Sequence, residues 1–321
     1  MVGYLLRRLG ASVLMIVLVS MLIFVVLRLL PGDPTITRFG QQEGIDPRTI
    51  AAMRAQLGLN DPIIVQYWHW VTGIVVHGDL GRSYFSQFAV GTLIAQRLGP
   101  TLELSVAGLF LAVVFAVVLA VLPTILRGRW WSRLVGTYTT IGLSAPPFVF
   151  GIVFVALFSV KLGWLPDRGY VSPSADLGGN LRLLVLPAVT LGLALSAPLI
   201  RYLRASLADV ETSSFVRTAT GKGITRSSVV FGHVLPNGLL PALTSLGVSV
   251  GAVLGGAVVV EYVFAWPGLG SLIVDSVFKR DYAVLQSTVL LLATVFVLVN
   301  LLVDILYGVL DPRLRVSGDR R

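Results

Sequence analysis

Cysteine is absent from this 321-residue chain, and only 13% of its residues are charged. The lack of cysteine excludes a disulfide framework, a thiolate metal site and a cysteine nucleophile. Soluble domains carry about one quarter charged residues, whereas here 55% of the residues are apolar. The apolar residues form several long blocks, which argues against a soluble enzyme with one core and against a disordered chain. The composition therefore predicts a membrane protein.

The sequence also lacks the motifs that carry bond chemistry. Gly221-Lys222-Gly223 is not a phosphate-binding loop, because Val216 stands where the first glycine is needed and Gly223 stands where Ser or Thr is needed. No Ser-His-Asp grouping, His-Glu-x-x-His motif or paired-carboxylate pattern is present. His69 and His77 have neither cysteine nor a carboxylate cluster at ligand spacing. We therefore predict no catalytic residue, no metal site and no cofactor.

Six segments are long and apolar enough to cross a bilayer, which takes about 20 residues of helix. They lie near residues 9–30, 101–126, 134–160, 181–203, 237–263 and 286–309. The first is predicted to be retained rather than cleaved as a signal peptide, because its apolar run is long and no small-residue cleavage site follows it. The predicted fold class is an all-α membrane protein with six transmembrane helices.

The positive charges predict the orientation. With both termini cytoplasmic, the inner segments hold 14 Lys and Arg residues, against 9 in the outer segments, which are longer in total. Cytoplasmic loops carry an excess of Lys and Arg, and residues 127–133 give the strongest local signal. The net charge of +9 is thus explained by topology, and no nucleic-acid partner is predicted.

Two segments between the spans look folded. In the outer segment 31–100, we expect one helix from Asp46 to Gly58 and another after Asp61-Pro62, through Val76. Three aromatic residues of the second helix are expected at the membrane interface or under a docked protein. They are Tyr67, Trp68 and Trp70.

The inner segment 201–236 predicts a helix, a glycine bend and a second helix. Ser213 or Ser214 caps the first helix, Gly221 and Gly223 end it, and Thr225 caps the second. A helix of about eight residues is only about 12 Å long and is marginal alone. It either packs on another surface or lies on the membrane as an amphipathic connector, and composition leaves both alternatives open.

Proline and glycine mark two of the predicted spans. Gly142, Pro146 and Pro147 are expected to break the third span, either to line a pathway or as a packing kink. Gly247, Gly251 and Gly255 recur every four residues in the fifth span, so they share one helix face and predict close packing. The spacing does not say whether the neighbouring helix belongs to this chain or to a second subunit.

The 201–236 segment resembles the cytoplasmic loop of ATP-binding-cassette importer permeases. Their pattern is Glu-Ala-Ala, three residues, Gly, nine residues, Ile, one residue and Leu-Pro. Ala219, Gly223, Leu235 and Pro236 match it. The pattern's Glu, first Ala and Ile are replaced by Arg217, Thr218 and His233.

Further landmarks resemble the dipeptide/oligopeptide/nickel permease family almost from end to end. They are Leu30-Pro31-Gly32-Asp33-Pro34, Leu57-Gly58-Leu59, Asp61-Pro62, Gln66-Tyr67, Gly78-Asp79-Leu80-Gly81-Arg82-Ser83, Glu261-Tyr262-Val263-Phe264, Pro267-Gly268-Leu269-Gly270 and the stretch from Asp304 to Asp311-Pro312-Arg313.

The resemblance implies a type I importer permease: a multi-pass subunit of the cytoplasmic membrane, surrounded by lipid, that performs no bond chemistry itself. Its implied partners are a second homologous permease, two ATP-binding-cassette ATPase subunits or domains, and an extracytoplasmic solute-binding protein. The implied divisions are residues 1–30, the extracytoplasmic segment 31–100 and the permease core 101–321 with its coupling loop 201–236. The residues expected to couple to the ATPases are Phe215, Arg217, Thr218, Ala219, Gly223, Leu235 and Pro236.

We expect short peptides as the substrate. Nickel or another small solute is the alternative, but the spans offer no imidazole and few carboxylate ligands. A secondary transporter or channel would also have six spans and no phosphate-binding loop. That class predicts titratable residues in mid-bilayer, whereas Glu103, Glu261 and Asp304 lie toward the span ends.

Overall fold

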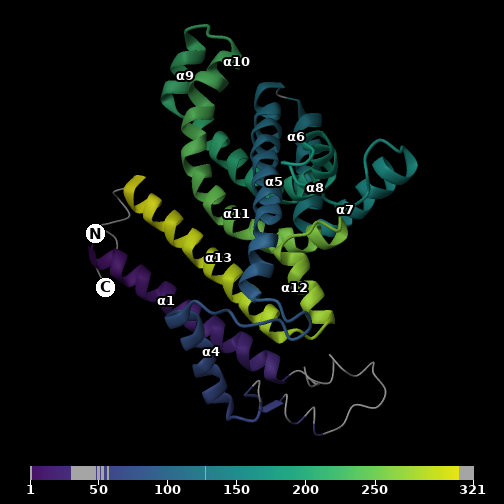
Figure 1. Ribbon diagram of the computed structural model, residues 1–321. Helices are drawn as coiled ribbons and strands as arrows, with labels where there is room; N and C mark the ends of the chain where they lie inside the picture. The colour runs from purple at the N-terminus through teal and green to yellow at the C-terminus, as the bar shows by residue number, and fades with distance from the viewer. Residues whose placement is uncertain are drawn as a thin grey trace. The chain divides into compact units, whose positions relative to one another are not determined.

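A computed structural model describes residues 2–29, 58–126 and 128–310, together with residues 48, 51, 54 and 55 (Figure 1). Most of the predicted helix from Asp46 to Gly58 lies outside the described residues. The described part is almost entirely helical, and Arg82 and Ala89 form an isolated β-bridge. The chain divides into two compact units. We call residues 1–100 and 267–301 the first unit, and residues 101–266 and 302–321 the second unit.

The first unit is built from helices at both ends of the chain. Its elements are α1 (Val2–Leu29), α4 (Ile63–His77), the start of α5 (Val90–Leu126), α12 (Leu269–Phe278) and most of α13 (Tyr282–Leu310). Val90 and Ile94 of α5 pack with Leu269, Leu272 and Val284 in one buried cluster. The sequence thus brings residues about 180 positions apart into one core.

Helices α1 and α4 contact each other through aromatic side chains. Phe24 is buried, and the rings of Tyr67 and Trp70 lie 5.5 and 5.8 Å from its ring. Ser20 and the Tyr67 hydroxyl share a hydrogen bond of 2.8 Å. Trp68, by contrast, is 64% exposed. Of the three aromatic residues expected at an interface, two therefore contact α1, and Trp68 alone is open to lipid or to a partner.

A buried carboxylate fixes the turn before α5. Asp281 is 4% exposed and accepts hydrogen bonds from the Ser83 hydroxyl and from the Tyr84 amide, the latter at 3.0 Å. Burial raises the pKa of the Tyr84 phenol. Because an unpaired buried carboxylate is costly, these bonds tie residues 83–85 to the start of α13.

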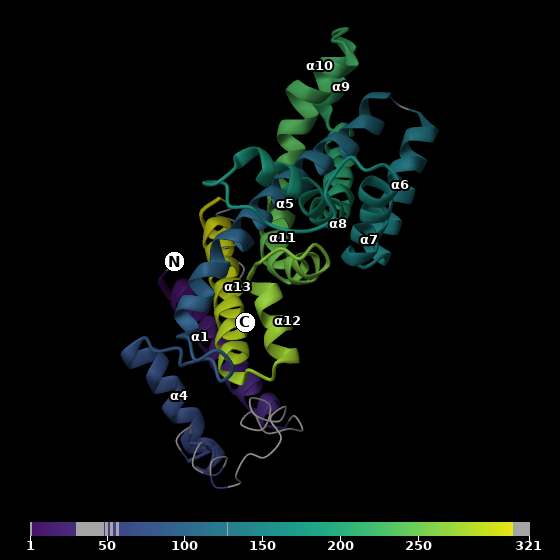
Figure 2. The ribbon, with the colours of Figure 1, turned by 45° about the vertical axis from the view of Figure 1, so that its right-hand side comes forward.

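The second unit contains the remaining helices and the larger core (Figures 1 and 2). Its further elements are α6 (Arg129–Ser144), α7 (Pro147–Phe154), the π-helical turn η1 (Val155–Lys161), α8 (Leu177–Glu211), α9 (Ser214–Gly221), α10 (Arg226–Val229), the π-helical turn η2 (Val230–Val234) and α11 (Leu235–Val263). Helix α8 is central: Leu191 and Ile200 are fully buried among side chains from α5, α6, η1 and α11.

Glycine permits a close contact between α5 and α8 in the second unit. A methyl group added at Gly192 of α8 would lie 2.8 Å from Leu111 Cβ of α5 and 3.2 Å from the Gly108 carbonyl oxygen. A methyl group at Gly108 would lie 2.6 Å from Leu191. Small residues of this kind let two helix backbones approach closely, so this pair sets the separation of α5 and α8.

The third predicted span is broken. Helix α6 ends at Ser144, α7 begins at Pro147, and the two parts meet at an angle of 109°. Pro146 has an extended backbone and Pro147 occupies the first turn of α7, where its missing N–H costs little. Gly142 lies within α6 instead, and a methyl group there would be 2.7 Å from Ala197 Cβ of α8. The prolines therefore make the bend, and Gly142 makes a helix contact.

Four helical stretches of the described chain are long and apolar enough to span a bilayer, and the bent pair raises the number to five. They are Leu6–Leu29, Val90–Leu126, Leu177–Glu211 and Tyr282–Ile305. Helix α11 covers the fifth predicted span and has 29 residues, and the count of six stays a prediction. Two helices extend beyond the predicted spans: α5 begins at Val90, before the span predicted from residue 101, and α8 continues to Glu211, past the span predicted to end near residue 203.

The three glycines of α11 differ in their surroundings. Gly247 and Gly251 are buried. Gly255 is exposed and has open space where a side chain would lie, whereas a methyl group on its neighbour Gly256 would be 3.2 Å from Leu191. Within this chain the close contact at that end of α11 is therefore made by Gly256.

Candidate functional site

The site expected from the sequence is the connection between α8 and α11. Helix α9 is eight residues long, and after a short bend α10 and η2 lead into α11. Figures 1 and 2 show α9 and α10 together at one end of the second unit. The order of helix, bend and helix agrees with the pattern of residues 201–236.

Helix α9 is anchored by one apolar face. Val216 and Ala219, three positions apart, are 3% and 6% exposed. They belong to a buried cluster whose other members come from α5, α8, α10 and η2: Ala120, Val121, Leu203, Leu207, Val229, Val230 and Val234. Burying a valine side chain stabilises a fold by about 1.5–3 kcal/mol. Such packing holds a helix that is too short to be stable alone.

Local hydrogen bonds to backbone carbonyls are present at both ends of α9. Ser213 precedes the helix in an extended conformation, but its hydroxyl donates to the Val210 carbonyl at 2.6 Å rather than to an α9 amide. After the helix, the Gly223 amide donates to the Thr220 carbonyl at 3.0 Å, and Gly223 has a φ of +76°. Only glycine adopts that conformation without strain, so this position fixes the bend toward α10.

An adjoining face of α9 borders a surface hollow of about 490 Å³, and Ala219 belongs to both faces. It is lined by Ser214, Phe215, Thr218, Ala219, Lys222, Ile224 and His233. Phe215 and Ile224 are 46% and 39% exposed, and Lys222 adds a positive charge. The hollow is thus an open surface with apolar side chains beside one cation.

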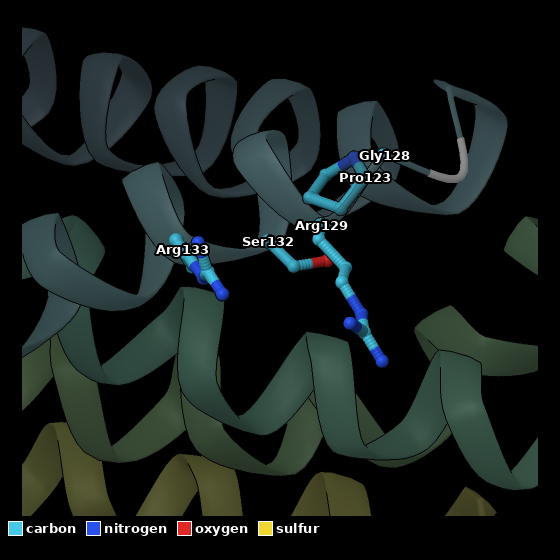
Figure 3. Close-up of a pocket in the computed structure, with 5 residues that line it drawn as sticks. All are labelled: Pro123, Gly128, Arg129, Ser132 and Arg133. Carbon is cyan, nitrogen blue, oxygen red and sulfur yellow. The ribbon is translucent and has the colours of Figure 1, made fainter.

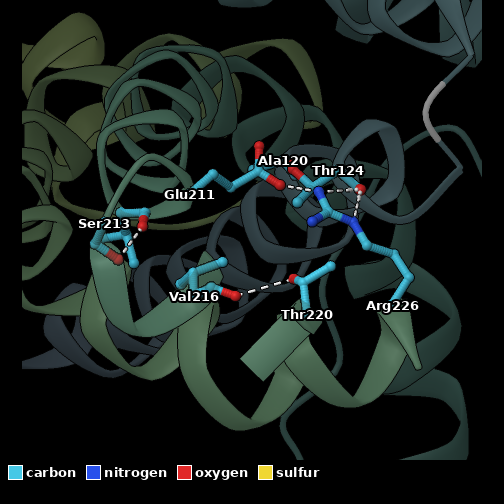
Figure 4. Close-up of polar contacts among 8 residues, drawn as sticks. Ala120, Thr124, Glu211, Ser213, Val216, Thr220 and Arg226 are labelled. Atoms are coloured by element: carbon cyan, nitrogen blue, oxygen red, sulfur yellow. Dashed lines mark hydrogen bonds and ion pairs between the residues drawn. The ribbon is translucent and has the colours of Figure 1, made fainter. Parts of the chain in front are cut away.

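Arg226, the first residue of α10, joins three elements (Figure 4). Its Nε and Nη2 atoms donate to the Thr124 carbonyl of α5 at 3.1 and 2.9 Å. Its Nη2 atom also forms an ion pair with Glu211, the last residue of α8. The two side chains are only 24% and 30% exposed, so solvent screens this pair less than an open surface pair.

A second hollow, of about 660 Å³, lies where α5 ends and α6 begins (Figure 3). It is lined by Pro123, Gly128, Arg129, Ser132 and Arg133. Its two arginines lie at the start of α6 and belong to residues 127–133, which carry the strongest orientation signal of the sequence.

A buried acid lies at the far end of α11. Glu261 is fully buried and accepts a hydrogen bond of 2.7 Å from the Thr101 hydroxyl of α5. Nearby in the chain, the Trp266 ring packs edge-on against Tyr170 at 4.8 Å. Glu261 therefore has a structural partner at the end of its helix.

The predicted coupling residues have different surroundings. Phe215, Thr218 and Ala219 line the hollow on α9. Arg217 is exposed and lies outside that lining, and Leu235 and Pro236 form the first turn of α11.

Sequence reasoning missed Lys222, Ile224 and His233 as lining residues, and it missed Arg226 with its two partners. Glu211 and Thr124 are 15 and 102 positions away from Arg226. Neither separation is a helical spacing, so the sequence carried no signal for these contacts.

Comparison with known proteins finds matches over nearly the whole length of the chain. Residues 104–316 match the family "Binding-protein-dependent transport system inner membrane component", and residues 1–105 match its N-terminal companion family. The glutathione transport system permease protein of Salmonella typhimurium is 41% identical over 98% of this chain and 99% of its own length. The protein of that name from Escherichia coli K12 is 40% identical over the same shares.

A solved structure supports the fold. The inward-facing MetNI methionine ABC transporter matches 68% of this chain and 96% of its own chain with a TM-score of 0.55 at 16% identity. The sequence resemblance is confirmed: this chain belongs to the family of inner-membrane permease components of binding-protein-dependent ABC importers.

Proposed function

We propose that this permease imports short peptides, of the size of a tripeptide, across the cytoplasmic membrane. The supporting observation is the identity of 41% over 98% of the chain to a permease named for glutathione transport, because glutathione is itself a tripeptide. Nickel, the alternative cargo, has no comparable support among these relatives.

The proposed partners follow from the family. A second permease, two ATPase subunits or domains and an extracytoplasmic solute-binding protein would complete the importer. ATP binding and hydrolysis would belong to the ATPases, since the sequence of this chain contains no phosphate-binding loop.

The surface of α9 is the proposed contact with an ATPase. It bears the exposed Phe215 and Lys222 beside a hollow of about 490 Å³, and the buried Val216 and Ala219 hold α9 in place. A partner that fills this hollow would move α9 together with the helices that anchor it. Rigid-body motion of this kind is a common basis of alternating access.

The bend between α6 and α7 is the proposed opening of the substrate pathway. Non-helical backbone at membrane depth is tolerated where protein or a water-filled cavity covers it. Pro146 and Pro147 fall at the bend of 109°, which supports a pathway role for these two residues. Gly142 contacts α8 and is proposed only as a packing residue.

The test is reconstitution in vesicles with the three partners. The solute-binding protein is placed on the extracytoplasmic side of the vesicle membrane and ATP on the side of the ATPases. We then expect ATP-dependent accumulation of labelled di- and tripeptides, including glutathione, on the ATPase side. We also expect the purified chain alone to show no nucleotide turnover.

Two results would count against the proposal. Uptake of nickel or a sugar without any peptide uptake would reject the peptide substrate and keep the importer. Substantial ATP turnover by this chain alone, after contaminating ATPases are removed, would reject the division of roles.

A further inference from the structure

We propose that Arg226 is a positioning residue that makes α10, the end of α8 and the end of α5 move as one body. The inference rests on the proposed coupling through α9 and names the residue by which that movement reaches the spans. Its basis is the set of contacts that one guanidinium group makes with two other helices.

The first contact is with the end of α5. Thr124 lies in the last turn of a helix that ends at Leu126, where backbone carbonyls have no partner within the helix. Two nitrogens of Arg226 donate to the Thr124 carbonyl at 3.1 and 2.9 Å. A cation at this end of a helix also interacts favourably with the helix dipole. Arg226 therefore caps α5 from another part of the chain.

The second contact is with the end of α8. Glu211 is the last residue of α8, and its carboxylate pairs with the Arg226 Nη2 atom. The planar guanidinium fork can hold a carbonyl and a carboxylate at the same time, whereas the ammonium group of lysine is a compact point charge on a flexible stem. The arrangement thus depends on arginine.

Arg226 closely follows the bend after α9, so its contacts can transmit a movement of α9 to α5 and α8. Only Ile224 and Thr225 separate it from Gly223, whose φ of +76° makes the bend after α9. Helix α10 has four residues, too few to be stable alone. Helix α9 also packs on α5 and α8 through Val216 and Ala219, and Arg226 adds a polar tie to that packing. Without Arg226, more of a displacement of α9 would be taken up by this bend and by α10, and less of it would reach α5 and α8.

The experiment measures peptide uptake per ATP hydrolysed by the assembled importer in vesicles. For Arg226→Gln we expect this ratio to fall about tenfold, the effect of losing a charged hydrogen-bonding group. Expression, complex assembly and ATP hydrolysis should persist. Arg226→Lys should recover the ratio only in part, because lysine restores the charge but not the two-nitrogen contact with Thr124.

A matched control is Arg204→Gln. Arg204 is a half-buried arginine of α8 that has no ion pair among the described residues, and its replacement should leave the ratio unchanged. Glu211→Gln provides a second variant if Arg226→Gln fails to assemble. It removes the ion pair, keeps the contacts with Thr124, and should lower the ratio by a smaller factor.

An unchanged ratio in Arg226→Gln, or in Glu211→Gln where only that variant assembles, would overturn the positioning role. Peptide import itself is tested by the reconstitution described above, and coupling through α9 is tested by Gly223→Val, which should lower uptake and substrate-stimulated ATP hydrolysis together. If Gly223→Val does so and the Arg226 variants keep the wild-type ratio, coupling through α9 stands and the role of Arg226 fails. If neither substitution has its expected effect, both fail.

Discussion

At the scale of single residues, Gly223 gives the clearest test, because its conformation and its surroundings point to one effect. Its φ is +76°, and no atom lies within 4 Å of the place where a side chain would begin. A β-branched residue there meets no steric clash with neighbours but costs about 1–3 kcal/mol of backbone strain. Gly223→Val should therefore change the bend rather than the core.

We expect Gly223→Val to lower transport and substrate-stimulated ATP hydrolysis severalfold, while membrane insertion and complex assembly persist. Gly221→Val is the matched control. Gly221 also has open space around it and has no positive φ, so this variant should behave nearly as wild type. Full activity of an assembled Gly223→Val complex would contradict the role of the bend.

The residues of the site also show what sequence can and cannot foresee. The bend at Gly223 could be predicted from the sequence, because a short helical stretch precedes it and glycine adopts a positive φ without strain. Arg226 was not visible, since its partners belong to helices whose ends and packing appear only in the fold. The side chain of Arg217, where the family pattern has Glu, is exposed.

At the scale of helices, the crossing of α5 and α8 depends on the absence of side chains. Gly192→Ala would place a methyl group 2.8 Å from Leu111 Cβ and 3.2 Å from a backbone oxygen of α5. Since backbone cannot rotate away as a flexible side chain can, the helices must separate. Overpacking of this kind costs about 1–3 kcal/mol, and we expect a lower midpoint of thermal unfolding in detergent.

Gly136→Ala is the control for this substitution. Gly136 lies in α6, and nothing lies within 4 Å of an added methyl group. Removing glycine from an open helix position normally stabilises slightly, so the unfolding midpoint should stay equal or rise. Equal midpoints for Gly192→Ala and Gly136→Ala would show that the crossing tolerates a wider separation.

The spans were predictable because length and apolar composition suffice to identify them. Their ends were not, because hydropathy marks the part of a helix that lies in lipid rather than the helix itself. Helix α8 continues to Glu211 since contacts hold it there: Leu207 is buried, and the Ser206 hydroxyl donates to the Gly238 carbonyl at 2.8 Å. Helix α5 likewise begins before Pro100, where the sequence predicted a boundary.

At the scale of the whole molecule, the absence of cysteine makes the orientation directly testable. Helix α8, with 35 residues and about 52 Å of length, separates the loop before it from α9 and α10. If α8 crosses the membrane once, exposed positions before and after it lie on opposite sides. The excess of Lys and Arg predicts that α9 and α10 are cytoplasmic.

Ser174→Cys and Ser227→Cys provide one exposed thiol on each side of α8. In intact cells whose outer permeability barrier has been opened, a membrane-impermeant maleimide should label Ser174→Cys at once. Ser227→Cys should be labelled only after the cytoplasmic membrane is also permeabilised. The reverse pattern would overturn the orientation predicted from charge and would place α9 away from any cytoplasmic ATPase. Labelling of both thiols in intact cells would show that α8 does not cross the membrane, because a single crossing must leave one of them protected.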